Sequence, residues 1–434
     1  MFGTIKNAFK IPELRKKLIY TMIIILLYRL GAIVPVPFVQ PSLISLPEGS
    51  IFQYLNILSG DAFQKATLFA LSISPYITAS IVIQLLCVAI PALERLSKEG
   101  EEGKKKINAI TRYVTVALAL LTSIGYYLLM KNTYQCLTDD GKQWYGAVVI
   151  IACYCAGASI IMWLGEKINE NGIGNGISMI LFANIVSSGP ALIGSLIDTF
   201  SSYINLIAGG DYLGILWIFL TVLMIVGVLA AVVFVVFITD SERKLPVQYA
   251  KRVVGRKMYG GQSSNLPIKL NMSGVMPIIF ASSIISLPVT IMQFCGVAQT
   301  NFWYQLFGTS SPVYIILFFV LIIAFSYFYI AISFNPQEVS NNLQKNGGFI
   351  PGIRPGRPTA EYITKVLSKV TLMGAMFLSI IAVLPLIINA VSGNALAGIA
   401  FSGSSLLIVV GVALETAREI EAQMTMRHYK GFLE

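Results

Sequence analysis

The chain has 434 residues, of which 56% are hydrophobic and 12% charged, with a formal net charge of +10 and a mean hydropathy of +0.74. An ordinary globular protein carries about 25% charged residues, so a soluble globular chain is excluded. A disordered chain needs low hydrophobicity, and a collagen-like chain needs a three-residue glycine period, which is absent. The sequence therefore predicts a polytopic membrane protein.

Ten apolar runs are candidates for membrane-spanning helices, because a bilayer core of about 30 Å needs about 20 helical residues. The runs are continuous, whereas strands of a membrane barrel alternate polar and apolar side chains over about 10 residues. We expect an all-α fold with ten transmembrane helices and a retained basic N-terminal segment, because no cleavage site follows the first run. The runs cover residues 18–34, 76–90, 113–130, 145–164, 177–197, 213–238, 275–294, 313–334, 370–389 and 400–414.

A short helical pattern lies between the first two runs. Ile51, Leu55, Leu58 and Ala62 recur at the spacing of one helical face. The segment from Ile51 to Ser59 would span about 14 Å, which is too short to cross a bilayer. It is either an interfacial anchor or a re-entrant element, and the pattern alone leaves both open.

Lysine and arginine are distributed unevenly between the two sides of the predicted helices. With the N-terminus inside, the inner segments hold 27 of the 31 basic residues, and the outer connections hold only Lys65, Lys131 and Lys142. The positive-inside rule then places both termini in the cytoplasm. Arg29 is the only formal charge well inside a run, and we expect it to snorkel to the outer membrane surface.

Two inner connections, residues 239–274 and 335–369, exceed the about 12–15 residues beyond which a connection is usually functional or disordered. Both mix Tyr, Val, Ile and Leu with charged residues, so ordered cytoplasmic projections are expected. The ten runs divide five and five, and an odd number of spans inverts the second half, as in inverted repeats. We expect an N-terminal half at 1–197, with the short helix near 51–62, an external hinge connection at 198–212, and a C-terminal half at 213–434.

Residues for catalysis or metal binding are scarce. His428 is the only histidine and no G-x-x-x-x-G-K-[ST] motif occurs, so histidine chemistry and ATP hydrolysis are not expected. The NGIGNG sequence at 171–176 lacks the preceding strand of a nucleotide loop, and a tight turn is expected there. No enzyme activity, cofactor or metal site is predicted. Cys87, Cys153 and Cys155 lie in apolar runs and should be buried thiols, whereas a pairing of Cys136 with Cys295 is left open.

Branched apolar residues four positions apart share a helical face at Ile77 and Ile81, and at Leu181 and Ile185. Lipid-facing helices show such pairs too, so the spacing alone does not predict a pore. If these side chains met on one axis, they would form an apolar constriction that excludes ions without a charged gate. Aliphatic side chains could also part for a polypeptide and close around it.

Six segments resemble the bacterial SecY family, the channel subunit of the Sec translocon, and the resemblance runs nearly end to end. They are FALSISPYITASIVIQLL (69–86), EGEEGKKKINAITRY (99–113), NGIGNGISMILFANIV (171–186), LPIKLNMSGVMPIIFASSI (266–284), FIPGIRPGRPTAEYI (349–363) and SGSSLLIVVGVALE (402–415). The resemblance implies an hourglass pore for unfolded secretory chains between two five-helix halves. It also implies a lateral gate, between helices 2 and 3 on one side and 7 and 8 on the other, that releases apolar segments into lipid.

The resemblance also assigns site residues. The short helix, with Phe52, Leu55 and Leu58, is similar to the family's plug, which favours re-entry. Leu181 departs from the commoner isoleucine of the family's aliphatic pore ring but keeps the position apolar. The implied ring consists of Ile77, Ile81, Leu181, Ile185, Ile279 and Ile408.

Partners follow from the same resemblance. It implies SecE and SecG as membrane subunits, SecA ATPase or the ribosome on the cytoplasmic face, and an unfolded preprotein or signal sequence as substrate. Arg354 lies at the family's coupling position, and Lys251 and Arg252 lie at another basic contact position. The expected location is the bacterial cytoplasmic membrane, where the lipid bilayer receives apolar segments.

Two other classes fit less well. A small-solute transporter needs a polar or ionisable site near the midplane and no large docking loops. An intramembrane enzyme needs a catalytic dyad or metal ligands in its helices, which His428 alone does not provide.

Overall fold

A computed structural model describes residues 8–44, 51–208, 213–249, 252–254, 257–259, 263–294, 301–308, 311–391 and 397–430. Each predicted run overlaps one helix, and the prediction of an all-α polytopic membrane protein is confirmed. The ten helices are α2 (Pro12–Gly31), α4 (Ser74–Ala89), α6 (Glu101–Leu129), α8 (Trp144–Asn171), α9 (Gly176–Ala208), α10 (Leu213–Asp240), α11 (Met276–Phe294), α13 (Pro312–Ser333), α15 (Arg357–Val391) and α16 (Ala397–Lys430).

Shorter elements connect these helices. Helix α5 bends by 101° from α4 at a proline, as expected because the residue before a proline disfavours the α conformation. Helices α13 and α14 each begin with a proline in the first turn and a side chain, from Ser311 or Asn335, that caps the free N–H groups. The shorter elements are a 3₁₀ turn (Pro41–Leu43), α3 (Ile51–Ser59), α5 (Pro91–Lys98), a π-helical turn (Met130–Tyr134), α7 (Asp139–Lys142), α12 (Phe302–Leu306) and α14 (Pro336–Lys345).

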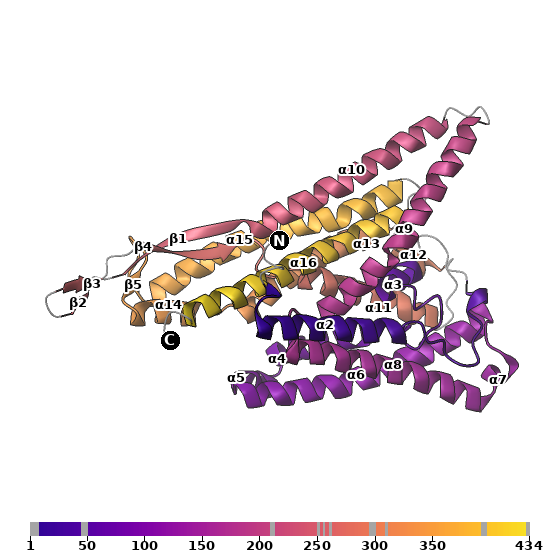
Figure 1. The fold of residues 1–434 in the computed structure, drawn as a ribbon, viewed down its shortest axis with the longest axis horizontal. Coiled ribbons are helices and arrows are strands. Elements are labelled where there is room, and N and C mark those ends of the chain that lie inside the picture. Colours follow the sequence, from indigo (N-terminus) through magenta and orange to yellow (C-terminus); the bar gives the residue numbers. More distant parts are fainter. Residues whose placement is uncertain are drawn as a thin grey trace.

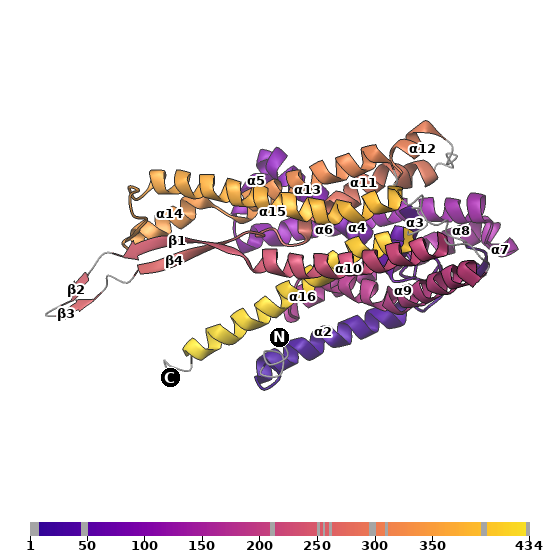
Figure 2. The ribbon, with the colours of Figure 1, turned by 90° about the horizontal axis from the view of Figure 1, so that it is seen from above.

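The helices form two groups joined through α9 (Figure 1). Helices α2, α4, α6 and α8 lie together, and α10, α13, α15 and α16 form the second group. Helix α9 contacts α2 and α8 on one side and α10 and α16 on the other. The start of α2 and the end of α16 lie toward the same end of the molecule, opposite α7 and α12 (Figures 1 and 2).

The helices differ in length, hydropathy and exposure. Among the described residues, five helices are long and apolar enough to cross a membrane on their own, or six if the bent pair α4 and α5 is one span. Helix α10 exposes large apolar side chains, such as Val233 and Phe237 at 69% and 70%, which suits a lipid contact. By contrast, α2 and α16 include charged turns, and α9 and α11 contain Pro190 and Pro288.

The described parts of the two long connections form one unit. Strands β1 (Glu242–Tyr249) and β4 (Ser263–Lys269) make an antiparallel hairpin, and β5 (Gly348–Phe349) adds to β1 from the second connection. Short strands β2 (Arg252–Val254) and β3 (Lys257–Tyr259) pair near the tip. The hairpin projects beyond the helices, beside α14 (Figure 2). The parts of these connections that the structure describes contain strands and a helix, and their pairing through β5 was not foreseen.

Side chains on one face of β1 pack this unit against the helices. Leu245 and Val247 are buried while their neighbours are exposed, the period of two expected for a strand covered on one face. Leu245 packs with Ile330 and Leu367, from α13 and α15. The described helix α15 has 35 residues, about 52 Å at 1.5 Å per residue, so it extends beyond the bilayer core and supports the sheet.

The NGIGNG segment is a tight turn between α8 and α9, as expected. Gly174 has a φ of +84°, a conformation that glycine adopts without strain. The backbone N–H of Ile173 donates to Thr21 Oγ1 (3.1 Å), and that of Gly174 donates to Glu419 Oε2 (2.9 Å). The turn therefore joins α2 to α16.

Cys136 is a free, buried thiol, which answers the open question of its pairing, whereas Cys295 lies outside the described residues.

A close helix contact at Gly157 gives a test of this packing. A Cβ on Gly157 would lie 2.0 Å from the Leu68 carbonyl oxygen, whereas a Cβ on Gly227 would meet nothing within 4 Å. We expect Gly157→Ala to lower the free energy of unfolding by about 1–3 kcal/mol through overpacking. Gly227→Ala should leave it unchanged or slightly higher. Thermal unfolding in detergent measures both, and equal effects would contradict the contact.

Candidate functional site

Six aliphatic side chains from both helix groups meet in one apolar cluster. Ile77 and Ile81 come from α4, Leu181 and Ile185 from α9, and the remaining two from α11 and α16. Each is at most 4% exposed. We call this set the aliphatic ring: Ile77, Ile81, Leu181, Ile185, Ile279 and Ile408. The six residues assigned by resemblance are thus all buried and belong to the same large apolar cluster, and their arrangement as a pore ring stays a prediction.

Helix α3 packs against three of the four helices that supply the ring. It contacts α9, α11 and α16. Ile57 belongs to the same cluster as the ring and Leu58 packs against it, whereas Phe52 and Leu55 join a second cluster with Phe63. The short helix is therefore re-entrant, because it lies inside the protein and not at a free membrane surface. Its C-terminal residues face the ring, and its N-terminal residues face α6 and α8.

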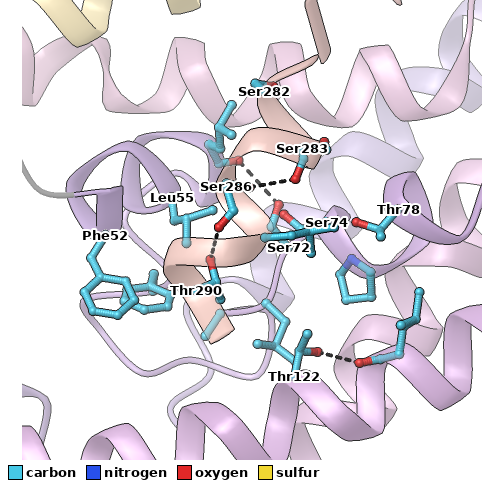
Figure 3. A pocket seen from close by; sticks show the side chains of 17 residues that line it. Phe52, Leu55, Ser72, Ser74, Thr78, Thr122, Ser282, Ser283, Ser286 and Thr290 are labelled. Atoms are coloured by element: carbon cyan, nitrogen blue, oxygen red, sulfur yellow. Dashed lines mark hydrogen bonds between the residues drawn. The ribbon is translucent and has the colours of Figure 1, made fainter. Parts of the chain in front are cut away.

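A cavity of about 110 Å³ lies between α3, α4, α6 and α11 (Figure 3). Many of its lining side chains carry hydroxyl groups, and these donate largely within their own helix. Ser283 donates to the Ile279 carbonyl (2.8 Å), Thr290 to Ser286 (2.8 Å) and Thr122 to Leu118 (2.9 Å). The helices on either side can therefore separate without breaking these hydrogen bonds. The hydroxyl-bearing residues are Ser72, Ser74, Thr78, Thr122, Ser282, Ser283, Ser286 and Thr290.

These hydroxyl groups were missed in the sequence. The signal was present on α11, where Ser282, Ser286 and Thr290 recur at four-residue spacing within an apolar run. That spacing places them on one helical face. Their meeting with α4 and α6 depends on tertiary packing, which periodicity does not reveal.

Of the residues predicted to dock a partner, the structure places Arg354 in a turn beside the sheet and Arg252 on a short strand. Arg354 is exposed, in a turn flanked by Gly352 and Gly356 with φ of +82° and +96°. Its carbonyl accepts a hydrogen bond from Thr359 Oγ1 (2.8 Å), and nearby Ile350 and Ile363 pack with Val247 of β1. The turn is thus fixed on the sheet while the Arg354 side chain points to solvent. Arg252 begins β2, and Lys251 lies outside the described residues.

Arg29 does not snorkel, so that expectation is wrong. Its Nη2 donates to the carbonyl oxygen of Ala183 on α9, and its side chain is only partly exposed. A backbone carbonyl inside the protein satisfies the guanidinium, so it need not reach the membrane surface. Among the residues that the structure describes, no group of three His, Cys, Asp or Glu side chains could hold a metal ion.

Comparisons with known proteins identify the family of the chain. A family model described as SecY matches residues 67–417. The protein translocase subunit SecY of Streptomyces scabiei is 43% identical over 451 aligned residues, which cover 100% of both chains.

Two solved structures share the fold. One, described as showing that the SecY plug domain stabilises the closed state of the translocation channel, has a TM-score of 0.63 and 17% identity, covering 97% of each chain. The other, Sec61 in the canine ribosome-channel complex, has a TM-score of 0.58 and 19% identity, covering 96% of each chain. At these identities the likeness concerns the fold.

The orientation of α3 gives a second test. Leu58 packs against the cluster that contains the ring, whereas Leu55 packs against the cluster that contains Phe52. Cysteines at these two positions should therefore react at different rates with a cysteine at position 185. In a chain whose native cysteines are replaced by serine, we expect a short bis-maleimide to link cysteines at 58 and 185 in the resting protein. Cysteines at 55 and 185 should link more slowly, and gel mobility measures both. A faster reaction of the 55–185 pair would contradict the orientation.

Proposed function

The chain belongs to the SecY family, and from this membership and its aliphatic ring we propose that it is the central subunit of a protein-conducting channel. It passes unfolded secretory polypeptides across the membrane and releases apolar segments sideways into lipid. The observation that carries the proposal is the meeting of six aliphatic residues from both helix groups, with α3 packed against them.

The ring supplies a seal that a polypeptide can pass. A narrow apolar constriction excludes water, and ions cannot cross it without losing their hydration. The ring side chains touch through dispersion contacts, each worth about 0.1–0.2 kcal/mol per atom pair. Such contacts can separate and re-form around side chains of different shape. The family's plug corresponds to α3, which occludes the path in the resting state through Phe52, Leu55 and Leu58.

Lateral release uses the boundary between α4 and α6 on one side and α11 and α13 on the other. The cavity lined by hydroxyl groups lies at this boundary, and its intrahelical hydrogen bonds allow the helices to part. Leu, Ile and Phe gain about 0.3–0.6 kcal/mol each on entering lipid, whereas Asp, Lys and Arg lose about 2.5–3.5. An apolar segment of about 20 residues therefore moves into the bilayer, and a hydrophilic segment continues through the ring.

Energy comes from a cytoplasmic partner, the SecA ATPase or the ribosome, because the sequence contains no ATP-binding motif. The sheet and the turn bearing Arg354 supply the docking surface, together with Lys251 and Arg252. The ribosome-bound state of the Sec61 relative supports a ribosome partner. SecE and SecG complete the channel. The membrane is the bacterial cytoplasmic membrane with both termini inside, which the basic inner segments support.

The ring predicts the effect of a polar substitution. We expect Ile81→Asn or Ile408→Asn to raise resting ion conductance, because an amide hydrates the constriction, whereas Ile81→Leu should leave it unchanged. Conductance of the reconstituted complex in planar bilayers is the measurement. If both asparagine variants conduct like the unmodified channel, these positions do not form the seal.

The docking surface predicts the effect of charge reversal. Arg354→Glu should abolish SecA-driven transport of an unfolded preprotein into proteoliposomes, because the reversed charge repels the partner at the docking surface. The thermal stability should be unchanged, because the Arg354 side chain is exposed to solvent. Lys345→Glu, an exposed reversal on the adjacent α14, is the matched control and should retain transport. Equal loss of transport in both variants would indicate that added negative charge on this surface repels the partner wherever it is placed. Normal transport with Arg354→Glu would refute a coupling role.

A further inference from the structure

Arg29 lies where three segments meet inside the membrane region. It stands in the last turn of α2, and its Nη2 donates to the Ala183 carbonyl on α9. Both guanidinium Nη atoms lie 2.8 Å from the position that a Cβ on Gly60 would occupy. Gly60 follows α3 directly, with φ +64°, and its N–H donates to the Ile57 carbonyl (3.1 Å). The arginine therefore touches the C-terminal end of α3.

Asn184 of α9 holds the same end of α3 by hydrogen bonds. It is fully buried, and its Nδ2 donates to the Leu58 carbonyl (2.8 Å) and to Ser72 Oγ (3.3 Å). The Ser72 hydroxyl also donates to the Leu58 carbonyl (3.3 Å). The last carbonyls of a helix lack intrahelical partners and carry partial negative charge. A cation from α2 and an amide from α9 thus meet the end of α3 that most needs donors.

The location within α9 connects this contact to the ring. Ala183 and Asn184 lie between Leu181 and Ile185, so one helical turn supplies two ring side chains and the groups that hold α3. Charged side chains inside a membrane protein are costly and are retained where carbonyls or other partners satisfy them. A small residue is also required at position 60, because a side chain there would displace the guanidinium.

We propose that Arg29 and Asn184 form a latch that holds the plug helix closed by its C-terminal end. The inference rests on the proposed function, because it assigns α3 the role of the plug. Displacing α3 removes the Asn184 bond to Leu58 and separates Gly60 from Arg29, while the Arg29 bond to Ala183 can remain. Both are positioning residues, since they act through α3 and do not contact the translocating chain in the resting state.

Resting conductance of the complete reconstituted complex tests the latch. We expect Arg29→Met and Asn184→Leu each to raise the frequency of resting openings at least about tenfold, which corresponds to about 1.4 kcal/mol. Arg29→Lys should open less often at rest than Arg29→Met but more often than the unmodified channel, because an ammonium can donate to one carbonyl but lacks the fork of a guanidinium. Lys65→Met, the loss of an exposed charge after α3, is the control and should change nothing.

Two further variants separate a latch from a simple brace between α2 and α9. Gly60→Ala should also raise openings, since its methyl group would displace the guanidinium and crowd the Asn184 carbonyl oxygen, which lies 3.1 Å from the same Cβ position. In a channel lacking residues 51–59, Arg29→Met should add no further openings. A further rise in that background, or unchanged openings with both Arg29→Met and Gly60→Ala, would overturn the latch. Failure of the proposed function would instead appear as absent preprotein transport in the unmodified complex.

Discussion

In the channel that we propose, exclusion of water by the aliphatic ring is the constraint on which the rest of the structure depends. The ring is built from α4, α9, α11 and α16, so neither helix group closes it alone. Dispersion contacts are non-directional, and the constriction can therefore widen without a specific bond being broken. A ring of charges would hold ions, and a ring of hydrogen bonds would need new partners for each passing side chain.

The helices around the ring contact both lipid and the protein interior. Helix α10 faces lipid and is apolar on most sides, whereas α9 and α11 place hydroxyl and amide groups toward the interior. Polar groups such as Ser283 and Thr290 are satisfied within their own helix. The boundary between the groups therefore combines low adhesion with satisfied hydrogen bonds, which suits repeated opening.

The strand unit combines close packing on the helices with an exposed arginine, as the docking surface that we propose requires. Leu245 and Val247 fix the hairpin on α13 and α15, and β5 ties the second connection to the first. Arg354 is presented on a turn held by this packing. The helices and the two long connections could be predicted because they depend on local hydropathy and composition. The pairing of β1 with β5, the hydroxyl-lined cavity and the inward contact of Arg29 join residues far apart in sequence, and no local pattern encodes them. The place of α3 was open from its length alone, and the ring residues were identified by resemblance, because their spacing also suits a lipid-facing helix.

Ionic current through a channel occupied by its substrate tests the seal most directly. A preprotein with a folded C-terminal domain can be arrested part-way through the reconstituted complex, so that α3 is displaced and only the ring remains. We expect the conductance to stay close to that of the empty resting channel, because aliphatic side chains close around the extended chain. A large steady current with the chain in place would contradict sealing by the ring.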